Sequence, residues 1–439
     1  MYRVAVVGSG VGGLAAAWQL SAQSHLQVSL FEAGAHFGGH ANTVDLTLEG
    51  ITHGVDTGFL VFNHRTYPGL TRLFADLGID TAPSDMSFSV QVPANGARGP
   101  SLEWSGNSIS SVFAQRRNLL RPGFWRMLAD IVRFNRLCTG IAERQADNEL
   151  HQSIAAFLDE HGFSQAFRSH YFLPMIGCIW SCPTEQMLRF PVATMIRFCH
   201  NHGLIQITNR PQWHTVRGGS RHYVQKLLER ITDRRLRCPV LGLTRLEHGV
   251  LLQTPEGAES FDAVVLACHS DQALALLGAG ASGQEREVLG AIRYQHNMAV
   301  LHTDTSVLPR SRAAWAAWNY ERATDDQQEQ ARVCLHYLIN LLQPLPWHQP
   351  VIVSLNPSRP INEQQVHQRI EYAHPVFDLA AIEAQRRVPA LQGHRRTWFC
   401  GAWCGYGFHE DGWRSGVEAA SQLLAAQAGW QAPALQGAA

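Results

Sequence analysis

The first forty residues alternate between short apolar runs and a glycine-rich segment. Residues 2–7 (YRVAVV) form a β-branched, apolar run of the kind found in buried parallel strands. The glycine-rich segment 8–13 follows, and then an alanine- and leucine-rich stretch, 14–20, that favours a helix. Residues 27–31 are again apolar and end on Glu32. The pattern predicts a strand, a tight turn, a helix and a second strand.

The glycines of this unit match the spacing G-x-G-x-x-G at Gly8, Gly10 and Gly13. The first glycine permits the turn, the second lets a pyrophosphate approach the backbone, and the third lets the helix pack closely. The free N–H groups at the helix N-terminus then hold the phosphates. Glu32 ends the second strand, where a carboxylate accepts hydrogen bonds from a ribose. The order of these parts predicts a dinucleotide-binding unit.

Hydrophobic periodicity predicts further strands and helices along the chain. The stretch 153–210 is helical by periodicity and rich in aromatic residues, and Pro174, Pro183 and Pro191 divide it. The other predicted elements are a hairpin over 44–48 and 51–55, a helix over 67–78, strands at 87–92, 261–269, 298–302, 333–339 and 397–402, a β-meander over 242–254, and a helix opening at Asp411.

Arginines and large apolar residues interleave over 112–144. Seven arginines stand there against Asp130 and Glu143, with Phe124 and Trp125 among the apolar residues. A basic amphipathic helix with tryptophan on its apolar side is typical of a helix that lies on a membrane surface. An ordinary surface helix packed on the core has the same periodicity. Both interpretations stay open here.

Composition narrows the class of protein. The 439 residues carry a formal net charge of zero, which gives no indication of nucleic-acid binding, and their number suggests two or three domains. Lys226 is the only lysine. The nine cysteines include no C-x-x-C pair, so we expect buried thiols in a cytoplasmic protein and no metal site. We expect neither a signal peptide nor a membrane-spanning helix, since no apolar run reaches about 18 residues.

Two further glycine motifs carry a resemblance to a known family. The pair Gly38-Gly39 precedes a hairpin into Asp56-Thr57-Gly58, and residues 397–402 (TWFCGA) precede the helix at Asp411. Together with the first unit, these motifs resemble the FAD-containing amine oxidase and phytoene desaturase superfamily. The resemblance implies an α/β fold, in which a Rossmann-like FAD-binding domain carries an inserted α+β substrate domain. The implied division is FAD-binding parts at 1–80, 216–290 and 393–430, substrate-domain parts at 81–215 and 291–392, and a tail at 431–439.

The resemblance also implies which residues contact FAD. His40 stands where the family usually has a polar or basic residue after the glycine pair, and Asp411 stands where a glycine is usual. The helix after Ala402 would direct its N-terminus at the flavin, where it stabilises the negative charge of the reduced ring. The implied cofactor contacts are Gly8, Gly10, Gly12, Gly13, Glu32, Gly38, Gly39, His40, Gly58, Val240, Ala267, Gly401, Ala402 and Gly412.

The chain is also similar to bacterial NAD/FAD-binding oxidoreductases encoded beside cyclopropane-fatty-acyl-phospholipid synthase-like methyltransferases. Segments 84–89, 115–120, 210–213 and 405–412 carry this similarity. It implies action on methylated or cyclopropane-type fatty acyl chains, including the route to furan fatty acids. We therefore expect an FAD-dependent oxidoreductase that desaturates an apolar lipid substrate. Trp180, Trp213 and Tyr406 are the predicted substrate contacts.

Three alternatives remain at this stage. An FAD-dependent isomerase or hydratase of unsaturated acyl chains fits the same motifs. An amine oxidase fits less well, because many of these enzymes place a lysine near the flavin and Lys226 follows the Gly218-Gly219 turn. A flavin-bearing binding protein is disfavoured by the cluster His409-Glu410-Asp411, which we predict to be catalytic, although the cluster equally fits a helix N-cap. We expect a small-molecule or lipid partner, and a peripheral contact with the inner membrane face, but no oligomeric state follows.

Overall fold

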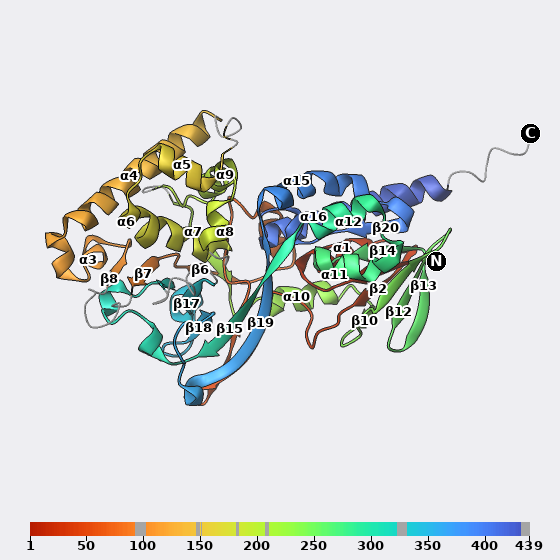
Figure 1. The fold of residues 1–439 in the computed structure, drawn as a ribbon. Coiled ribbons are helices and arrows are strands. Elements are labelled where there is room, and N and C mark those ends of the chain that lie inside the picture. Colours follow the sequence, from red (N-terminus) through yellow and green to blue (C-terminus); the bar gives the residue numbers. More distant parts are fainter. Residues whose placement is uncertain are drawn as a thin grey trace, which may run out of the picture.

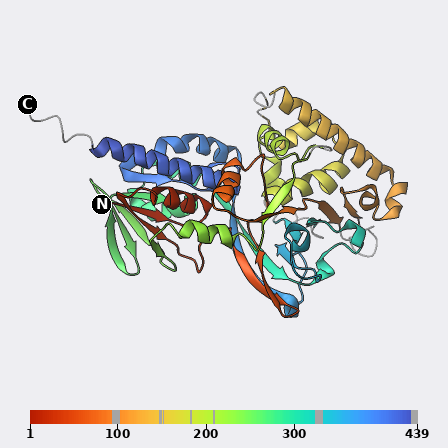
Figure 2. The same ribbon diagram turned by 180° about the vertical axis from the view of Figure 1, so that it is seen from behind.

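The computed structural model describes residues 1–92, 102–145, 150, 152–180, 184–206, 210–322 and 332–431. These residues form two halves, each built on its own large sheet (Figure 1). One half holds the N-terminus and a five-stranded sheet, and the other holds a seven-stranded sheet with a group of helices packed on it. The view from behind shows the same division, with the long C-terminal helix on the first half (Figure 2).

The five-stranded sheet is entirely parallel, with the order β10–β2–β1–β14–β20. Val4 and Val6 of β1 enter one hydrophobic core, whereas Ala5 and Val7 enter another. Successive side chains of a strand point to opposite faces, so an unbroken apolar run suits a strand that is covered on both sides. The strands are β1 (Tyr2–Val7), β2 (Leu26–Phe31), β10 (Asp233–Arg235), β14 (Ala263–Leu266) and β20 (Thr397–Phe399).

Helices cover one face of this sheet, and helices together with a small sheet cover the other. The core that contains Val4 includes α1 (Val11–Leu20), α10 (Arg221–Leu228) and α16 (His409–Gln431). The opposite face carries β11 (Gly242–Arg245), β12 (Val250–Thr254), β13 (Gly257–Phe261), α11 (Ser270–Leu277), α12 (Gly283–Gly290) and α15 (Leu379–Arg387).

The seven-stranded sheet has the order β19–β15–β18–β17–β16–β7–β8. Its neighbours are antiparallel except for β16 and β7, which are parallel. The long pair β15 and β19 extends from this sheet to the other half of the molecule (Figure 1). The strands are β7 (Phe88–Val92), β8 (Leu102–Ser105), β15 (Arg293–His302), β16 (Trp318–Glu321), β17 (Cys334–Leu338), β18 (Ile352–Leu355) and β19 (Val366–Val376).

Two small sheets and further helices complete the fold of the described residues. A hairpin joins β3 (Thr43–Leu48) to β4 (Ile51–Asp56), and a three-stranded sheet has the order β5–β9–β6. The remaining elements are β5 (Phe62–Asn63), β6 (Thr81–Ser84), β9 (Trp213–Val216), α2 (Pro68–Asp76), α3 (Ile109–Val112), α4 (Pro122–Glu143), α5 (Ile154–Glu160), α6 (Gln165–Phe167), α7 (Leu173–Trp180), α8 (Thr184–Leu188), α9 (Val192–Asn201) and α14 (Ile339–Leu342).

The prediction of one helix across 112–144 was wrong. α3 ends at Val112, a short 3-10 helix, η2 (Arg116–Leu120), follows, and α4 begins at Pro122. Proline favours the first position of a helix because the N–H group there has no partner within the helix. α4 buries Phe124 and other apolar residues in the core, as an ordinary surface helix does. Among the described residues, none of the helices combines the length and apolar character needed to cross a membrane.

The other predicted elements are confirmed, with shifts of a few residues at their ends. The predicted helix 67–78 is α2, and the predicted helix at Asp411 is α16, which begins at His409. The predicted tail 431–439 lies outside the described residues, apart from Gln431 at the end of α16.

Candidate functional site

The turn between β1 and α1 brings backbone atoms of distant segments into contact. Gly8 has φ +103°, and a Cβ atom there would lie 2.9 Å from the carbonyl oxygen of Ala267. A Cβ atom at Gly13 would lie only 1.9 Å from the Gly8 oxygen. A Cβ atom at Gly10 would instead meet nothing within 4 Å, so this glycine borders open space. The three positions thus behave as the motif predicts: two serve packing and one faces a ligand space.

Glu32 holds its carboxylate beside this turn. Its Oε2 accepts hydrogen bonds from the backbone N–H of Ser9, at 3.0 Å, and from the Ser9 hydroxyl, and its Oε1 accepts one from the N–H of Gly34 at 2.7 Å. The N–H of Cys238 donates to the Glu32 carbonyl at 2.8 Å, which brings the chain toward half-buried Val240. The acid is therefore fixed at the end of β2, where the sequence predicts a ribose.

The Gly38-Gly39 pair lies directly against the glycine-rich turn between β1 and α1. The N–H of Gly38 donates to the Ser9 carbonyl at 3.1 Å, and a Cβ atom at Gly39 would lie 3.1 Å from the Cα of Gly10. Both glycines have positive φ, of +117° and +59°. A Cβ atom at Gly58 would lie 2.3 Å from the His40 oxygen, so the turn after the hairpin also packs on this segment.

His40 faces a group of rings that sequence reasoning did not identify. Its ring stacks on Tyr372 at 4.8 Å between centroids and lies 5.2 Å from the ring of His374. Burial and the nearby histidines hold the pKa of His40 well below its usual value. The Nε2 atom of His40 is buried and has no hydrogen-bond partner among the described residues. Tyr372 and His374 lie on β19, some 330 residues further along the chain, so local patterns give no signal for them.

The C-terminal motif packs its glycines against the first glycine motif. A Cβ atom at Gly12 would lie 3.1 Å from the Gly412 oxygen and 3.4 Å from the Cα of Gly401. A Cβ atom at Gly412 would lie 2.5 Å from the Cγ1 atom of Val11 and 3.5 Å from the backbone nitrogen of Ala402. The N-terminal parts of α1 and α16 therefore meet at this point. Two helix N-termini side by side favour negative charge.

The predicted catalytic cluster divides into three different sets of contacts. Both carboxylate oxygens of Glu410 accept hydrogen bonds from the first turn of α2, from the N–H groups of Gly69 at 2.8 Å and Leu70 at 3.0 Å. Glu410 thus caps the N-terminus of α2.

Asp411 fixes the loop before α16. Its Oδ2 accepts from the N–H groups of Tyr406 at 2.9 Å and Phe408 at 3.1 Å. Burial raises the pKa of Asp411 to about 6, against these hydrogen bonds. The departure from the family's usual glycine thus adds a side chain that orders this loop. Asp411 thus contacts the backbone just before its own helix, whereas Glu410 caps the neighbouring helix α2.

His409 contacts rings rather than charged groups. It stacks on Phe59 at 3.8 Å between centroids, and its Nε2 lies 3.0 Å from the hydroxyl of Tyr223. Burial lowers the pKa of His409 to about 3, so the ring is neutral at physiological pH. A catalytic role for residues 409–411 stays a prediction.

The predicted substrate contacts lie in one aromatic cluster. Phe198 lies 4.9 Å from Trp180 and 6.0 Å from Tyr406, measured between ring centroids. His202 stacks on Phe198 at 3.9 Å and lies 6.1 Å from Trp213. We call these residues, with Phe408 stacked on Phe198 at 4.8 Å, the aromatic cluster. Sequence reasoning missed Phe198, His202 and Phe408, because aromatic residues in or beside a helix are equally typical of the core.

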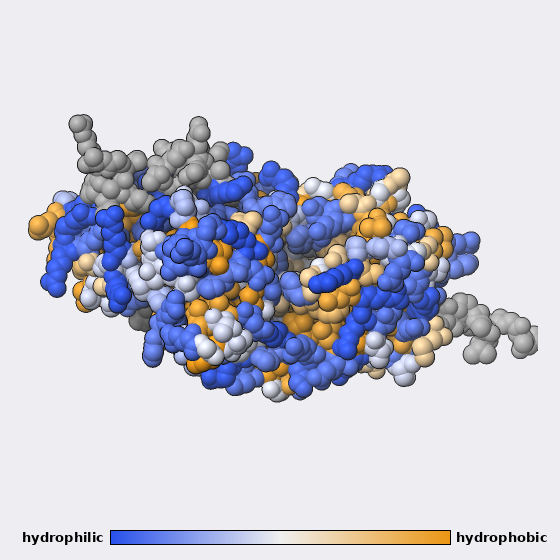
Figure 3. Space-filling view, turned by 90° about the horizontal axis from the view of Figure 1, so that it is seen from below, coloured by the Kyte–Doolittle hydropathy of each residue, from blue (hydrophilic) through white to orange (hydrophobic). Residues whose placement is uncertain are grey.

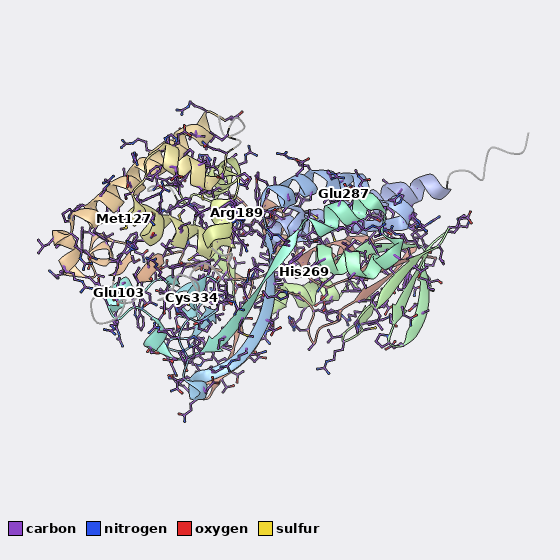
Figure 4. All side chains as sticks on the ribbon, in the orientation of Figure 1. Glu103, Met127, Arg189, His269, Glu287 and Cys334 are labelled. Carbon is purple, nitrogen blue, oxygen red and sulfur yellow. The ribbon has the colours of Figure 1, made fainter. Side chains whose placement is uncertain are left out.

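A second polar group lies in the seven-stranded sheet, where Figure 4 labels Cys334. The donor atoms of Glu321, Cys334 and His336 lie within 4.8 Å of one another, which would suit a metal ion geometrically. Arg359 and Ser358 donate to Glu321 at 2.7 to 2.8 Å, and His336 lies 3.2 Å from it. These donors already compensate the negative charge of the buried Glu321 carboxylate, so we assign the group a structural role.

The comparisons with known proteins decide the family. Residues 11–302 match the model of the family described as flavin containing amine oxidoreductase. The chain belongs to this family. Its cofactor is FAD, and its fold is that of the FAD-dependent amine oxidases. No curated protein sequence matches the chain significantly.

Solved structures of this fold cover almost the whole flavoprotein. Cyclohexylamine oxidase from Brevibacterium oxydans IH-35A is 16% identical with a TM-score of 0.66, over 97% of this chain and 99% of that one. A CLA-producing fatty acid isomerase from P. acnes is 16% identical with a TM-score of 0.65, over 96% and 98%. Putrescine oxidase bound to putrescine is 14% identical with a TM-score of 0.66, over 97% and 99%. Identities this low establish the fold and not the substrate.

The residues of the site fit FAD. Gly10 borders an open space next to the paired N-termini of α1 and α16, which suits a pyrophosphate. Glu32 lies at the end of β2, where the sequence predicts a ribose, and the Nε2 of His40, which has no partner among the described residues, offers a polar contact beside the glycine pair. His269 stacks on Tyr294 at 4.3 Å, near the region where the long strands join the halves (Figure 4). The cofactor contacts of individual residues stay predictions.

Proposed function

We propose that this flavoprotein dehydrogenates an apolar, lipid-like substrate of the fatty acyl class. The observation that carries the proposal is the aromatic cluster, which reaches the loop of the C-terminal glycine motif through Tyr406 and Phe408. Trp180, Phe198 and Trp213 are at least nine-tenths buried. Such a surface excludes water and favours a hydrocarbon chain over a charged group.

The charges beside the cluster support the same conclusion. An amine substrate needs a carboxylate or another acceptor for its ammonium group. Among the described residues, the carboxylates of Glu410 and Asp411 lie beside the cluster and are engaged: Glu410 accepts from backbone N–H groups of α2, and Asp411 accepts from N–H groups of its own loop and pairs with Arg414 at 3.4 Å. His202 and His409 are neutral, with pKa values lowered by burial to about 4 and about 3. Lys226 pairs with Glu229 at 3.2 Å on exposed helix surface.

FAD, when bound, accepts a hydride from a substrate carbon. The protein's part would be to hold the substrate carbon against the hydride acceptor, at the roughly 3–3.5 Å that a reactive geometry needs, and to keep water out. The neighbouring carbon must also lose a proton to form the double bond. We assign that proton to His409, which would pass it on to water rather than keep it, because burial lowers the pKa of His409 to about 3.

Anaerobic mixing tests the proposal. The purified holoenzyme should lose its visible flavin absorbance when mixed with phospholipids that carry cyclopropane or methyl-branched acyl chains. Putrescine and cyclohexylamine serve as the amine comparison, and straight saturated chains serve as the acyl control. Conversion of an unsaturated chain with no loss of absorbance, and with no electron acceptor required, would instead establish an isomerase or hydratase. Faster reduction by either amine would refute the proposal.

A variant of the aromatic cluster sharpens this test. Phe408→Leu removes the ring that stacks on Phe198 and leaves the backbone N–H that donates to Asp411. Loss of one aromatic contact weakens binding by about 0.5–1.5 kcal/mol, so KM for the acyl substrate should rise roughly 3- to 10-fold. The maximal rate of flavin reduction should change much less. An unchanged KM would place the acyl chain elsewhere.

A further inference from the structure

Exposed apolar side chains gather at the end of the molecule formed by α3, η2 and the start of α4. Leu120 is 87% exposed, Ile109 82% and Trp125 49%. Single exposed apolar residues are ordinary on a protein surface, but a contiguous group marks an interaction site. The question is therefore whether these residues are neighbours.

Contacts join Phe113, Trp125 and Leu119, while Ile109 lies one helical turn before Phe113 and Leu120 directly follows Leu119. The ring of Phe113 lies 5.3 Å from the ring of Trp125, and the N–H of Phe113 donates to the Ile109 carbonyl at 3.1 Å. The indole N–H of Trp125 donates to the Leu119 carbonyl at 2.9 Å, which fixes the ring beside η2. We call Ile109, Phe113, Leu119, Leu120 and Trp125 the Trp125 surface.

Exposed arginines accompany the Trp125 surface. Arg116, Arg117 and Arg126 are exposed on η2 and α4, and the sequence has no acidic residue between Glu103 and Asp130. Asp130 is buried and pairs with Arg133 at 3.0 Å.

The elements packed against α3 do not reverse this charge. Glu103 on β8 is buried and accepts from the N–H of Ser311, while η7 (Arg312–Ala314) adds the exposed Arg312. At this end of the molecule, on the left in Figure 3, hydrophobic residues lie beside long hydrophilic ones. Among the described residues at this end, the local charge is therefore positive although the whole chain is neutral.

We propose that the Trp125 surface binds the face of an anionic lipid bilayer. Leucine and isoleucine side chains can enter the acyl region, the indole ring suits the headgroup level, and the arginines face lipid phosphates. The complementary charge favours anionic lipid over a neutral partner, and the exposed tryptophan beside arginines is the combination found at a membrane interface. This proposal goes beyond the proposed function and does not depend on it.

Vesicle sedimentation with the holoenzyme tests the proposal without any substrate. At low salt the protein should bind vesicles of mixed phosphatidylglycerol and phosphatidylcholine, and it should bind pure phosphatidylcholine far more weakly. The triple variant Arg116→Gln, Arg117→Gln, Arg126→Gln should lose about 100-fold in affinity, since each arginine near an anionic surface is worth about fivefold. The double variant Ile109→Ser, Leu120→Ser should lose at least about tenfold and bind only at low salt.

A matched control separates the effect of the Trp125 surface on vesicle binding from the effect of the protein's net charge. Arg72, Arg286 and Arg386 are exposed on α2, α12 and α15, so changing all three to Gln removes the same charge elsewhere. This control should bind vesicles as the wild type does, and the flavin absorbance checks the folding of every variant. The proposal is wrong if the wild type ignores anionic vesicles at low salt, if the control loses as much affinity as the triple variant, or if the protein instead self-associates through this surface.

Discussion

The contacts of Glu410 make a prediction that separates a structural role from a catalytic one. Its two oxygens accept from Gly69 and Leu70 at 2.8 and 3.0 Å, at the start of α2. Removing a side-chain cap costs about 0.5–2 kcal/mol, and a hydrogen bond to a charged group is worth about 1.5–3 kcal/mol. Because Glu410 is partly exposed, we expect Glu410→Ala to lower the free energy of unfolding by about 2 kcal/mol. Glu410→Gln keeps one acceptor and should lose about half of that.

Guanidinium unfolding followed by circular dichroism measures the change. Glu418→Ala is the matched control, because Glu418 is exposed on the same helix and accepts a hydrogen bond from the side chain of Gln422. FAD content and the rate of flavin reduction by the acyl substrate should stay within about threefold of wild type in Glu410→Ala. A variant that is as stable as wild type but reduces its flavin a hundredfold more slowly would refute the capping argument. It would restore Glu410 to the chemistry.

Two further predictions concern the cofactor and pH. Gly10→Val should fold, because a Cβ atom there meets nothing within 4 Å, but it should bind no FAD, because the side chain would occupy the space left for the pyrophosphate; retained FAD would refute the assignment. Gly13→Val should fail to fold, since its Cβ atom would lie 1.9 Å from the Gly8 oxygen. As the pH decreases through 5, the free energy of unfolding should fall by about 4 kcal/mol for each pH unit. Guanidinium unfolding midpoints measured at several pH values would show this fall. Near pH 5 the unfolded chain protonates five histidines whose pKa values burial lowers to about 4 or about 3 in the fold, and His40, whose pKa burial lowers well below its usual value, acts in the same direction. Asp56 and Asp411, whose pKa values burial raises to about 6, offset two of these protons. A stability that rises from pH 6.5 to 5 would contradict this sign. The histidines are His170, His202, His302, His374 and His409.

The sequence determined the flavin-binding framework by itself. The glycines at 8, 10 and 13 have their spacing because a strand, a turn and a helix must pass a phosphate within a short stretch of chain. Glu32 follows from the same local geometry, and so does the apolar run of β1, whose two faces are both buried. Such features depend on neighbours in the chain, and periodicity records them.

Tertiary structure decided what surrounds that framework. Tyr372 and His374 reach His40 from a strand far along the chain, and Phe198 joins Trp180 to Tyr406 across two helices and a loop. Glu410 looked equally suited to catalysis and to capping, and only the position of α2 assigned its two oxygens. Residues 112–144 predict one helix, because arginine and apolar residues recur there at helical spacing. The break before Pro122 then placed Leu120 and Ile109 on the exposed surface rather than on a buried face. Such contacts join residues with no fixed separation in sequence, which is the physical reason that no local pattern encodes them.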